Sequence, residues 1–269
     1  MLDNCLESVY RTIEKIQFEV ILVDNSSKDD GLESILKRYT KIQFINNSKN
    51  VGFARANNQG AKIASGDFLL FINPDTIMIE DAVESMLGYI RSDSSIGILG
   101  PKVLNPDQTT QFSCRKFPTV WSGLFNRYSL MTRLFPNNRY SKDYLMLDYD
   151  HNSICSVDWV SGCCMMMSES TLKKTGGVDE NYFLFIEDVD LCRVIKEQGL
   201  RVVYFPNAKI FHKISSSNAR ATPQMIIKRH QGMIYYNQKY GETNLVIQYL
   251  INSIITARCL FQILLNIIK

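Results

Sequence analysis

The stretch FLLFINPDTIMIED, Phe68 to Asp81, decides the fold class of this chain. Its first residues are apolar without alternation, which is typical of a strand covered on both faces in a parallel sheet. Pro74 has no backbone N–H to give to a sheet ladder, so we expect the strand to end at Asn73. Asp75 would then lie at the carboxyl end of the strand, which is the edge where open α/β sheets bind their ligands.

Strands and helices alternate around this stretch. The predicted strands are Phe18 to Asn25, Ile42 to Asn47, Asp67 to Asn73 and Ile96 to Leu104, and the predicted helices are Gly31 to Tyr39, Ala54 to Ala64 and Asp81 to Arg91. This alternation predicts an α/β fold whose mostly parallel central sheet is flanked by helices and connected by right-handed crossovers.

The second half of the chain is predicted to begin with an irregular excursion over the sheet edge, from about Gln108 to Ser156, where the periodic pattern weakens. Beyond it, WVSGCCMMMS predicts a buried strand, and STLKKTGG and EDVDLCRVIKEQG predict helices. LRVVYFP predicts a closing strand.

The composition is that of a globular protein. At 269 residues and 45% hydrophobic, the chain can bury the core of one large domain, with or without a small appendage. Its 30 basic and 27 acidic residues are nearly balanced, which gives no argument for nucleic acid as a partner. Seven cysteines without C-x-x-C spacing or a leading signal peptide predict reduced thiols in a cytoplasmic protein.

The tail from Thr243 to Lys269 is predicted to be an amphipathic helix. Its polar residues fall on roughly one side of a helical wheel: Gln248, Asn252, Thr256, Arg258, Gln262, Asn266 and Lys269. Because these residues interrupt the apolar run, we expect an interfacial or docking helix rather than a membrane-spanning one. Two roles stay open for the apolar side: membrane attachment, or packing on its own domain or on a twin subunit.

Asp75 has two interpretations from the residues alone. In N-P-D-T it is a common turn or helix-capping residue. At a strand end, its carboxylate can instead hold a divalent cation that bridges the oxygens of a diphosphate. His212, a few residues after the closing strand, is either a structural histidine or a further metal or phosphate ligand beside Asp75.

A second acidic cluster follows FLF, where Glu187, Asp188 and Asp190 begin a predicted helix. Favourable interaction with the helix dipole explains one or two of these carboxylates. It explains a third less well, unless one of them faces a site and acts as a general base. Near the amino end, Asp24 and Asn25 close a strand in VDNSSKDDG, either as part of a helix cap or as contacts to a nucleobase or ribose.

Five segments in this order resemble glycosyltransferase family 2, the inverting enzymes of GT-A fold, and within it the rhamnosyltransferase-like members. The segments are VDNSSKDDG, NVGFARANNQGAKIASGDFLLFINPDT, WVSGCCMMMS, GGVDENYFLFIEDVDLCRVIKEQG and RVVYFPNAKIFHKISSS. They cover the chain from Cys5 to about Tyr240.

The resemblance implies a role for each matching residue. It implies that Asp75, within Asn73-Pro74-Asp75, holds Mg or Mn on the donor diphosphate, with His212 as a further metal or diphosphate contact. It implies that Asp188 is the general base, with Glu187 beside it. The donor-binding positions that it implies are Asp24, Asn25, Asn58, Asn73, Asp75, Trp159 and Gly162.

The chain departs from the family at its beginning. MLDNCLESVYRTI is similar to the family's first helix, whereas members begin with an apolar strand that would lie between VILVDN and FLLFIN. We therefore expect residues 1–240 to form an N-terminally shortened GT-A domain and residues 241–269 to form the C-terminal helix.

The function that the resemblance implies is transfer of a sugar, with L-rhamnose from dTDP-rhamnose as the expected donor, to a polysaccharide or lipid-linked acceptor in cell-surface glycan synthesis. We expect the protein at the inner face of the plasma membrane. The alternative, motivated by the absent strand, is a catalytically impaired sugar-nucleotide-binding or assembly partner. A nucleotidyltransferase would share the metal and the sheet, but it normally has a Gly-rich phosphate loop that we do not find here.

Overall fold

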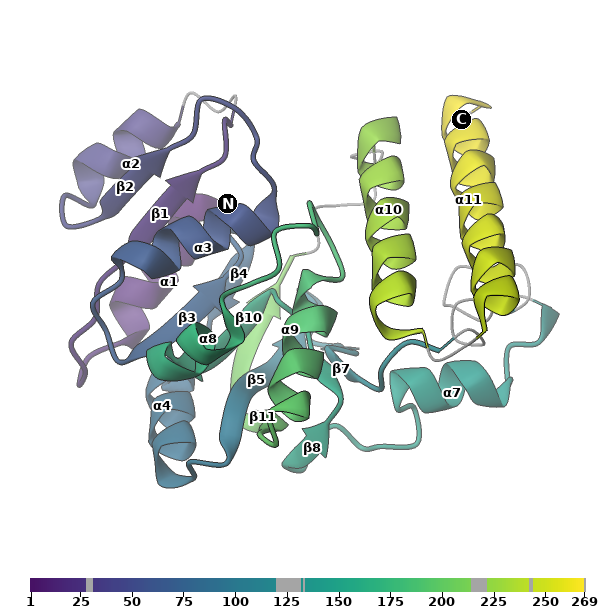
Figure 1. Cartoon of the computed structure of the whole chain (residues 1–269). Coiled ribbons are helices and arrows are strands. Elements are labelled where there is room, and N and C mark those ends of the chain that lie inside the picture. The colour runs from purple at the N-terminus through teal and green to yellow at the C-terminus, as the bar shows by residue number, and fades with distance from the viewer. Residues whose placement is uncertain (28–30, 120–131, 133, 214–221, 242–243, 269) are drawn as a thin grey trace. The chain divides into compact units, whose positions relative to one another are not determined.

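The computed structural model describes residues 1–27, 31–119, 132, 134–213, 222–241 and 244–268. The described residues form two compact units (Figure 1). The first unit comprises Met1–Phe18, Ser65–Thr175 and Leu191–Ile214, and the second comprises Glu19–Ala64, Gly176–Asp190 and Ser215–Lys269.

The first unit is built on a sheet of which seven strands lie in the described part of the chain, in the order β3-β10-β5-β11-β4, with β6 on β5 and β8 on β11. These strands are β3 (Phe68–Ile72), β4 (Thr76–Met78), β5 (Ile96–Leu104), β6 (Thr110–Gln111), β8 (Cys155–Val157), β10 (Cys164–Ser168) and β11 (Arg201–His212). A separate pair consists of β7 (Cys114–Arg115) and β9 (Trp159–Val160). β3 ends before Asn73, as the proline predicts.

The prediction of a mostly parallel sheet is wrong in this unit. Among its described strands only β5 and β11 pair in parallel, whereas β10 runs antiparallel to both β3 and β5, and β4 runs antiparallel to β11. An apolar run shows that a strand is buried, but it carries no sign of the strand's direction. β3, β5 and β11 nevertheless run the same way, so their carboxyl ends share one edge.

The expected single strand in WVSGCCMMMS is also wrong, because it divides into β9 and β10 around a turn at Ser161–Cys163. The turn lies where β10 enters the carboxyl edge of β3, since Cys164 pairs with Ile72. It therefore brings backbone carbonyls to the edge that Asp75 occupies.

Helices cover this sheet: α1 (Leu2–Thr12), α4 (Ala82–Ser92), α8 (Glu169–Thr175) and the Leu191–Glu197 part of α9 (Glu187–Glu197). In α4 the buried residues Val83, Met86, Leu87 and Ile90 follow helical spacing and join one hydrophobic core with the strands. Gly97 in β5 allows α9 to approach, since a Cβ there would lie 2.5 Å from Ile195 Cγ2.

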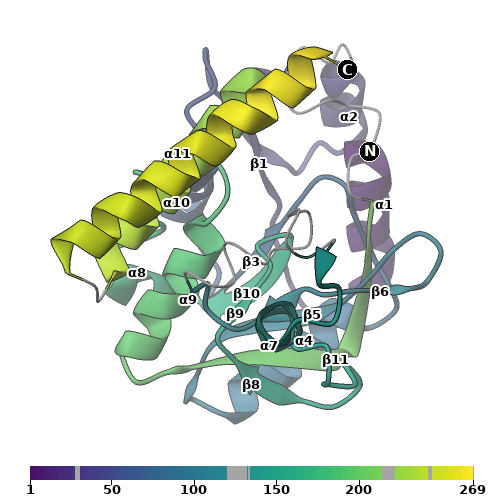
Figure 2. The same cartoon turned by 90° about the vertical axis from the view of Figure 1, so that its right-hand side faces the viewer.

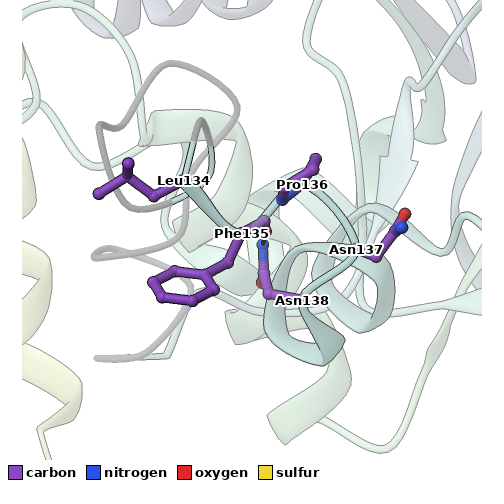
Figure 3. Close-up of a pocket in the computed structure, with 5 residues that line it drawn as sticks. All are labelled: Leu134, Phe135, Pro136, Asn137 and Asn138. Atoms are coloured by element: carbon purple, nitrogen blue, oxygen red, sulfur yellow. Dashed lines mark hydrogen bonds between the residues drawn. The ribbon is translucent and has the colours of Figure 1, made fainter.

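The excursion from Gln108 to Ser156 is less irregular than predicted, because it contains β6, β7, β8 and the short helix α7 (Arg139–Leu145). Before α7, a hollow is lined by Leu134, Phe135, Pro136, Asn137 and Asn138 (Figure 3). Leu134 and Phe135 are exposed, and Asn138 caps α7 by accepting a hydrogen bond from the Ser141 N–H. None of these five described residues has a titratable side chain.

The second unit contains a parallel pair, β1 (Ile21–Asp24) and β2 (Gln43–Asn46), with α2 (Leu32–Arg38) and α3 (Phe53–Ile63). It also contains the helices α10 (Pro223–Tyr240) and α11 (Leu245–Ile268). α3 packs on β1 at Gly60, where a Cβ would meet Val23 at 3.4 Å.

The two strands expected to flank an absent family strand are each paired on one side only within the described residues. β1 pairs with β2, and β3 pairs with β10 at the end of its sheet. No described strand pairs with both of them.

Candidate functional site

The first unit brings Asp75 and His212 together at the carboxyl edge of its sheet. Asp75 follows β3, and His212 ends β11, where it pairs with Thr76 of β4. His212 Nε2 lies 3.1 Å from Asp75 Oδ1, and both side chains are mostly buried. The predicted pairing of these two residues is therefore present in the structure.

The other side of the His212 ring is held by Gln111, which sequence reasoning missed. Gln111 Oε1 lies 3.2 Å from His212 Nδ1, and Gln111 Nε2 donates to the His212 carbonyl at 2.6 Å. With Oε1 as acceptor, Nδ1 carries the proton and Nε2 presents a lone pair toward Asp75. A side-chain partner on the far nitrogen is the usual way in which a ligating histidine is oriented.

Asn73 adds an oxygen donor to this edge. Its side-chain Oδ1 is buried and accepts no hydrogen bond from any described residue, which is uncommon for a buried polar atom. The turn that carries it is fixed by backbone bonds, since Asn73 N donates to the Cys163 carbonyl at 2.9 Å and Thr76 N donates to the Asn73 carbonyl at 3.1 Å.

These donors fit a divalent cation that is shared with a diphosphate. Mg²⁺ is commonly bound by one or two carboxylates, with substrate phosphates and waters completing its shell. Asp75, His212 and Asn73 supply one carboxylate, one imidazole and one amide oxygen. Within the described ranges no group of three or more His, Cys, Asp or Glu side chains is arranged to hold a metal ion alone.

Trp159 begins β9, and Gly162 lies in the turn between β9 and β10. Trp159 is buried, and its indole N–H donates to the Lys116 carbonyl at 2.8 Å, so the ring faces protein at that end. Arg115 lies over the ring at 5.1 Å from its centroid. Gly162 is buried beside the Cys163 carbonyl that holds Asn73. Their contact with a donor stays a prediction.

In the second unit, Glu187 and Asp188 follow a strained backbone. Phe185 and Ile186 have φ values of 67° and 74°, a region that β-branched residues rarely enter. Each such residue costs of the order of 1–3 kcal/mol and persists only where the surroundings enforce it, often at functional sites. The strain sets the direction in which α9 begins, and with it the direction of both carboxylates.

Glu187 and Asp188 are in different environments. Glu187 is 6% exposed, and its Oε2 has no hydrogen-bond partner among the described residues. Burial, together with the neighbouring Asp188 charge, raises the pKa of Glu187 to about 8. Asp188 is half-buried. Burial therefore favours the neutral form of Glu187 near neutral pH, while Asp188 is the more exposed of the two carboxyls.

Helix α10 anchors the segment before these carboxylates. Lys239 Nζ lies 2.8 Å from Asp179 Oδ2 and 3.0 Å from Asp190 Oδ2, and the Tyr182 hydroxyl donates to Asp190 at 2.9 Å. Gly232 lies under the strained turn, where a Cβ would be 3.4 Å from the Phe185 carbonyl. Sequence reasoning missed these contacts, because nothing in the sequence marks Lys239 as a partner of residues about 50 to 60 positions earlier.

Asn58 holds the same segment from α3. Its Oδ1 accepts from Val178 N at 2.9 Å, and its Nδ2 donates to the Val178 carbonyl at 2.8 Å and to Glu180 at 3.1 Å. Because these hydrogen bonds occupy the Asn58 side-chain amide with protein groups, they favour a role for Asn58 in positioning the segment at Val178 and Glu180. A donor contact by Asn58 stays a prediction.

Asp24 and Asn25 lie at the carboxyl end of β1, as predicted. Asp24 accepts a hydrogen bond from Ser27 N at 3.1 Å, which is a turn of the kind that Asp commonly forms. Asn25 holds the following loop, because its Oδ1 accepts from Val51 N at 2.9 Å and its Nδ2 donates to the Gly52 carbonyl at 3.2 Å. Of the pair, Asp24 is the one with a carboxylate available for a ligand.

Two named rhamnosyltransferases are similar in sequence. N-acetylglucosaminyl-diphospho-decaprenol L-rhamnosyltransferase of Mycobacterium tuberculosis is 26% identical over 79% of this chain and 72% of its own length. Rhamnosyltransferase WbbL of Escherichia coli K12 is 27% identical over 75% of each chain.

Two solved structures share the fold. GalNAc-T7, solved with UDP, GalNAc and Mn²⁺, superposes with a TM-score of 0.66 at 14% identity, over 88% of this chain and 45% of its own. The mannosyltransferase PcManGT of Pyrobaculum calidifontis, solved with GDP-Man and Mn²⁺, gives a TM-score of 0.59 at 15% identity, over 98% of this chain and 68% of its own. The fold is therefore that of the GT-A glycosyltransferases.

A family model described as Glycosyl transferase family 2 matches residues 1–169, which is more than half of the chain. This match includes β1, Asn58, the Asn73-Pro74-Asp75 turn and the β9–β10 turn. The chain is a glycosyltransferase that belongs to glycosyl transferase family 2.

Proposed function

We propose that this glycosyltransferase moves L-rhamnose from dTDP-rhamnose, with inversion, onto a polysaccharide or lipid-linked acceptor in cell-surface glycan synthesis. The observation that carries the proposal is the Asp75–His212 pair at the carboxyl edge of the sheet, preceded in the same turn by Asn73, whose buried Oδ1 accepts no hydrogen bond from any described residue. The choice of L-rhamnose, and of an acceptor carried on a lipid diphosphate, is supported by the names of the two relatives.

Inversion by a single displacement makes two demands on the chain. An acceptor hydroxyl must lose its proton as it attacks, and the departing nucleoside diphosphate must be stabilised. We assign the first task to Asp188 and the second to Asp75, His212 and Asn73. These residues would hold Mg²⁺ or Mn²⁺, which, when bound, neutralises charge on the diphosphate oxygens. Gln111 keeps His212 Nε2 available for this task.

Glu187 supports Asp188 by remaining neutral. With its pKa raised to about 8, it adds no second negative charge beside Asp188 near neutral pH. Asp24 and Asn25 are assigned to the nucleoside, and Trp159 and Gly162 to the sugar, in keeping with the family resemblance. We also propose a cytoplasmic protein that works at the inner membrane face, with a homodimer as one possible arrangement in solution.

The first test is donor binding. Heat of binding would be followed for dTDP-rhamnose, UDP-glucose and UDP-galactose in Mn²⁺, with the wild type, Asp75→Ala and Asp67→Ala. Asp67 precedes β3 at its opposite end, so it is a matched control. We expect metal-dependent binding of dTDP-rhamnose that Asp75→Ala loses and Asp67→Ala keeps. Equal binding by wild type and Asp75→Ala would remove Asp75 from the metal site.

The second test separates catalysis from binding. Asp188→Asn is expected to bind the donor as the wild type does and to transfer no sugar, because only the proton acceptor is lost. Strong residual transfer would remove Asp188 from the role of base. Donor binding without transfer in the wild type itself would favour the alternative of a catalytically impaired sugar-nucleotide-binding partner.

A further inference from the structure

Helix α11 presents its apolar side outward and its polar side to the protein. Figures 1 and 2 show α10 and α11 lying side by side, and hydrogen bonds join them. Gln248 Nε2 donates to the Asn237 carbonyl at 3.1 Å, and Asn237 Nδ2 donates to Asn252 at 3.0 Å. Nearer the end of α11, Arg229 donates to Gln262 at 2.5 Å. These polar residues of α11 therefore face α10 and form hydrogen bonds with it.

The outward side of α11 is almost wholly apolar. Its exposed large residues are Leu245, Val246, Ile247, Tyr249, Leu250, Ile254, Leu260, Phe261, Leu264, Leu265 and Ile267, several of them more than half exposed. Arg258 is the only charged residue between Leu245 and Ile267, and it lies on the half-buried side with Gln262. A helix on a water-exposed surface has the opposite arrangement, with its apolar stripe toward the core.

The stretch Leu245–Ile267 is long and apolar enough to cross a membrane, and 6% of its most apolar window is buried. By length and composition alone, the stretch therefore admits a spanning orientation as well as the interfacial one expected from the sequence. A spanning orientation is nevertheless opposed by α10. It stays hydrogen-bonded along α11, carries Lys228, Arg229 and Lys239, and is tied to the segment at Asp179. Charged side chains of this kind are costly in the hydrocarbon region.

We propose that α11 lies in the plane of one membrane leaflet, with its outward side in the acyl chains and α10 between it and the rest of the second unit. The occupant of this face is lipid. An uncharged apolar side of this length suits acyl chains, whereas protein interfaces resemble the rest of a protein surface in composition and usually include polar contacts. This goes beyond the proposed function by identifying the surface that would hold the enzyme at the membrane, and it does not depend on which sugar is transferred.

The test uses the full chain with vesicles of phosphatidylcholine and phosphatidylglycerol, without donor or acceptor. We expect the wild type to sediment with the vesicles. The double variant Leu250→Glu/Leu264→Glu changes two outward side chains and should lower the partition coefficient by about tenfold or more. Ile63→Glu is the control, because it places the same charge at an exposed apolar residue of α3. Circular dichroism would verify that each variant is folded.

Two outcomes would overturn the proposal. In the first, the wild type does not bind vesicles and analytical ultracentrifugation shows a dimer that Leu250→Glu/Leu264→Glu dissociates. The apolar face would then be an interface between two copies of the chain. Depth would separate in-plane from spanning: Leu245→Trp and Ile254→Trp, at two exposed positions, should be quenched equally by brominated lipids at each bromine position. A spanning helix would place Ile254 near the bilayer centre and Leu245 about 14 Å further along the helix, so their quenching would differ. Because no sugar is present, failure here leaves the donor-binding test unaffected.

Discussion

Replacing Glu187 by Gln should stabilise the protein increasingly as the pH rises. The Glu187 carboxyl is 6% exposed, and its Oε2 has no described hydrogen-bond partner. Burial and the Asp188 charge raise its pKa from 4.5 to about 8. Below pH 4.5 the carboxyl is neutral in the folded and the unfolded chain, so wild type and Glu187→Gln should respond alike to pH.

The sign follows from proton binding. Between pH 4.5 and about 8, the unfolded chain releases the proton and the folded chain keeps it, so the free energy of unfolding of the wild type falls as the pH rises. The slope is about 1.4 kcal/mol per pH unit, and the loss is complete above pH 8 at no more than about 5 kcal/mol. Glu187→Gln has no such proton to lose, so its advantage should grow over the same range.

Urea unfolding followed by circular dichroism at several pH values between 5.5 and 8.5 would measure this difference. Glu180→Gln is an informative control, because the Asn58 hydrogen bond, helped by Arg55, lowers the pKa of Glu180. Glu180 is therefore ionised in both the folded and the unfolded chain over this range, so the difference in stability between Glu180→Gln and the wild type should not change with pH. A constant difference between wild type and Glu187→Gln across the range would show that Glu187 is already ionised in the folded protein, and the argument for a neutral neighbour of Asp188 would fail.

Two further predictions concern the first unit. Gln111→Ala should weaken Mn²⁺-dependent donor binding by roughly 10- to 100-fold without unfolding the chain, because His212 loses the group that orients its ring; unchanged binding in calorimetry would assign Gln111 a purely structural role. Gly97→Ala should lower the free energy of unfolding by about 1–3 kcal/mol, since its Cβ would lie 2.5 Å from Ile195 Cγ2. Gly88→Ala in α4, with nothing within 4 Å of its Cβ, should instead be neutral or stabilising by up to about 1 kcal/mol; equal urea midpoints for the two variants would contradict the packing argument.

Local sequence determined the elements and part of the chemistry. Pro74 ended β3 because it lacks an N–H, and this placed Asp75 beyond a strand end. The pattern from Asp81 to Arg91 predicted the helix α4, and the polar residues of the tail predicted an amphipathic helix. These features depend on residues within a few positions of one another, where backbone chemistry and helical period act directly.

Tertiary structure decided which of these residues meet. The pairing of Asp75 with His212 depends on the register of β11 against β4, and the mixed sheet depends on β10 running between β3 and β5 in the opposite direction. The direction of α11 likewise depends on α10, because Asn237 of α10 forms hydrogen bonds with Gln248 and Asn252 on the polar side of α11, which a helical wheel would assign to water. Contacts between residues far apart in the chain determine the direction of a strand, its register and the partner of a helix face. Local periodicity therefore does not predict them.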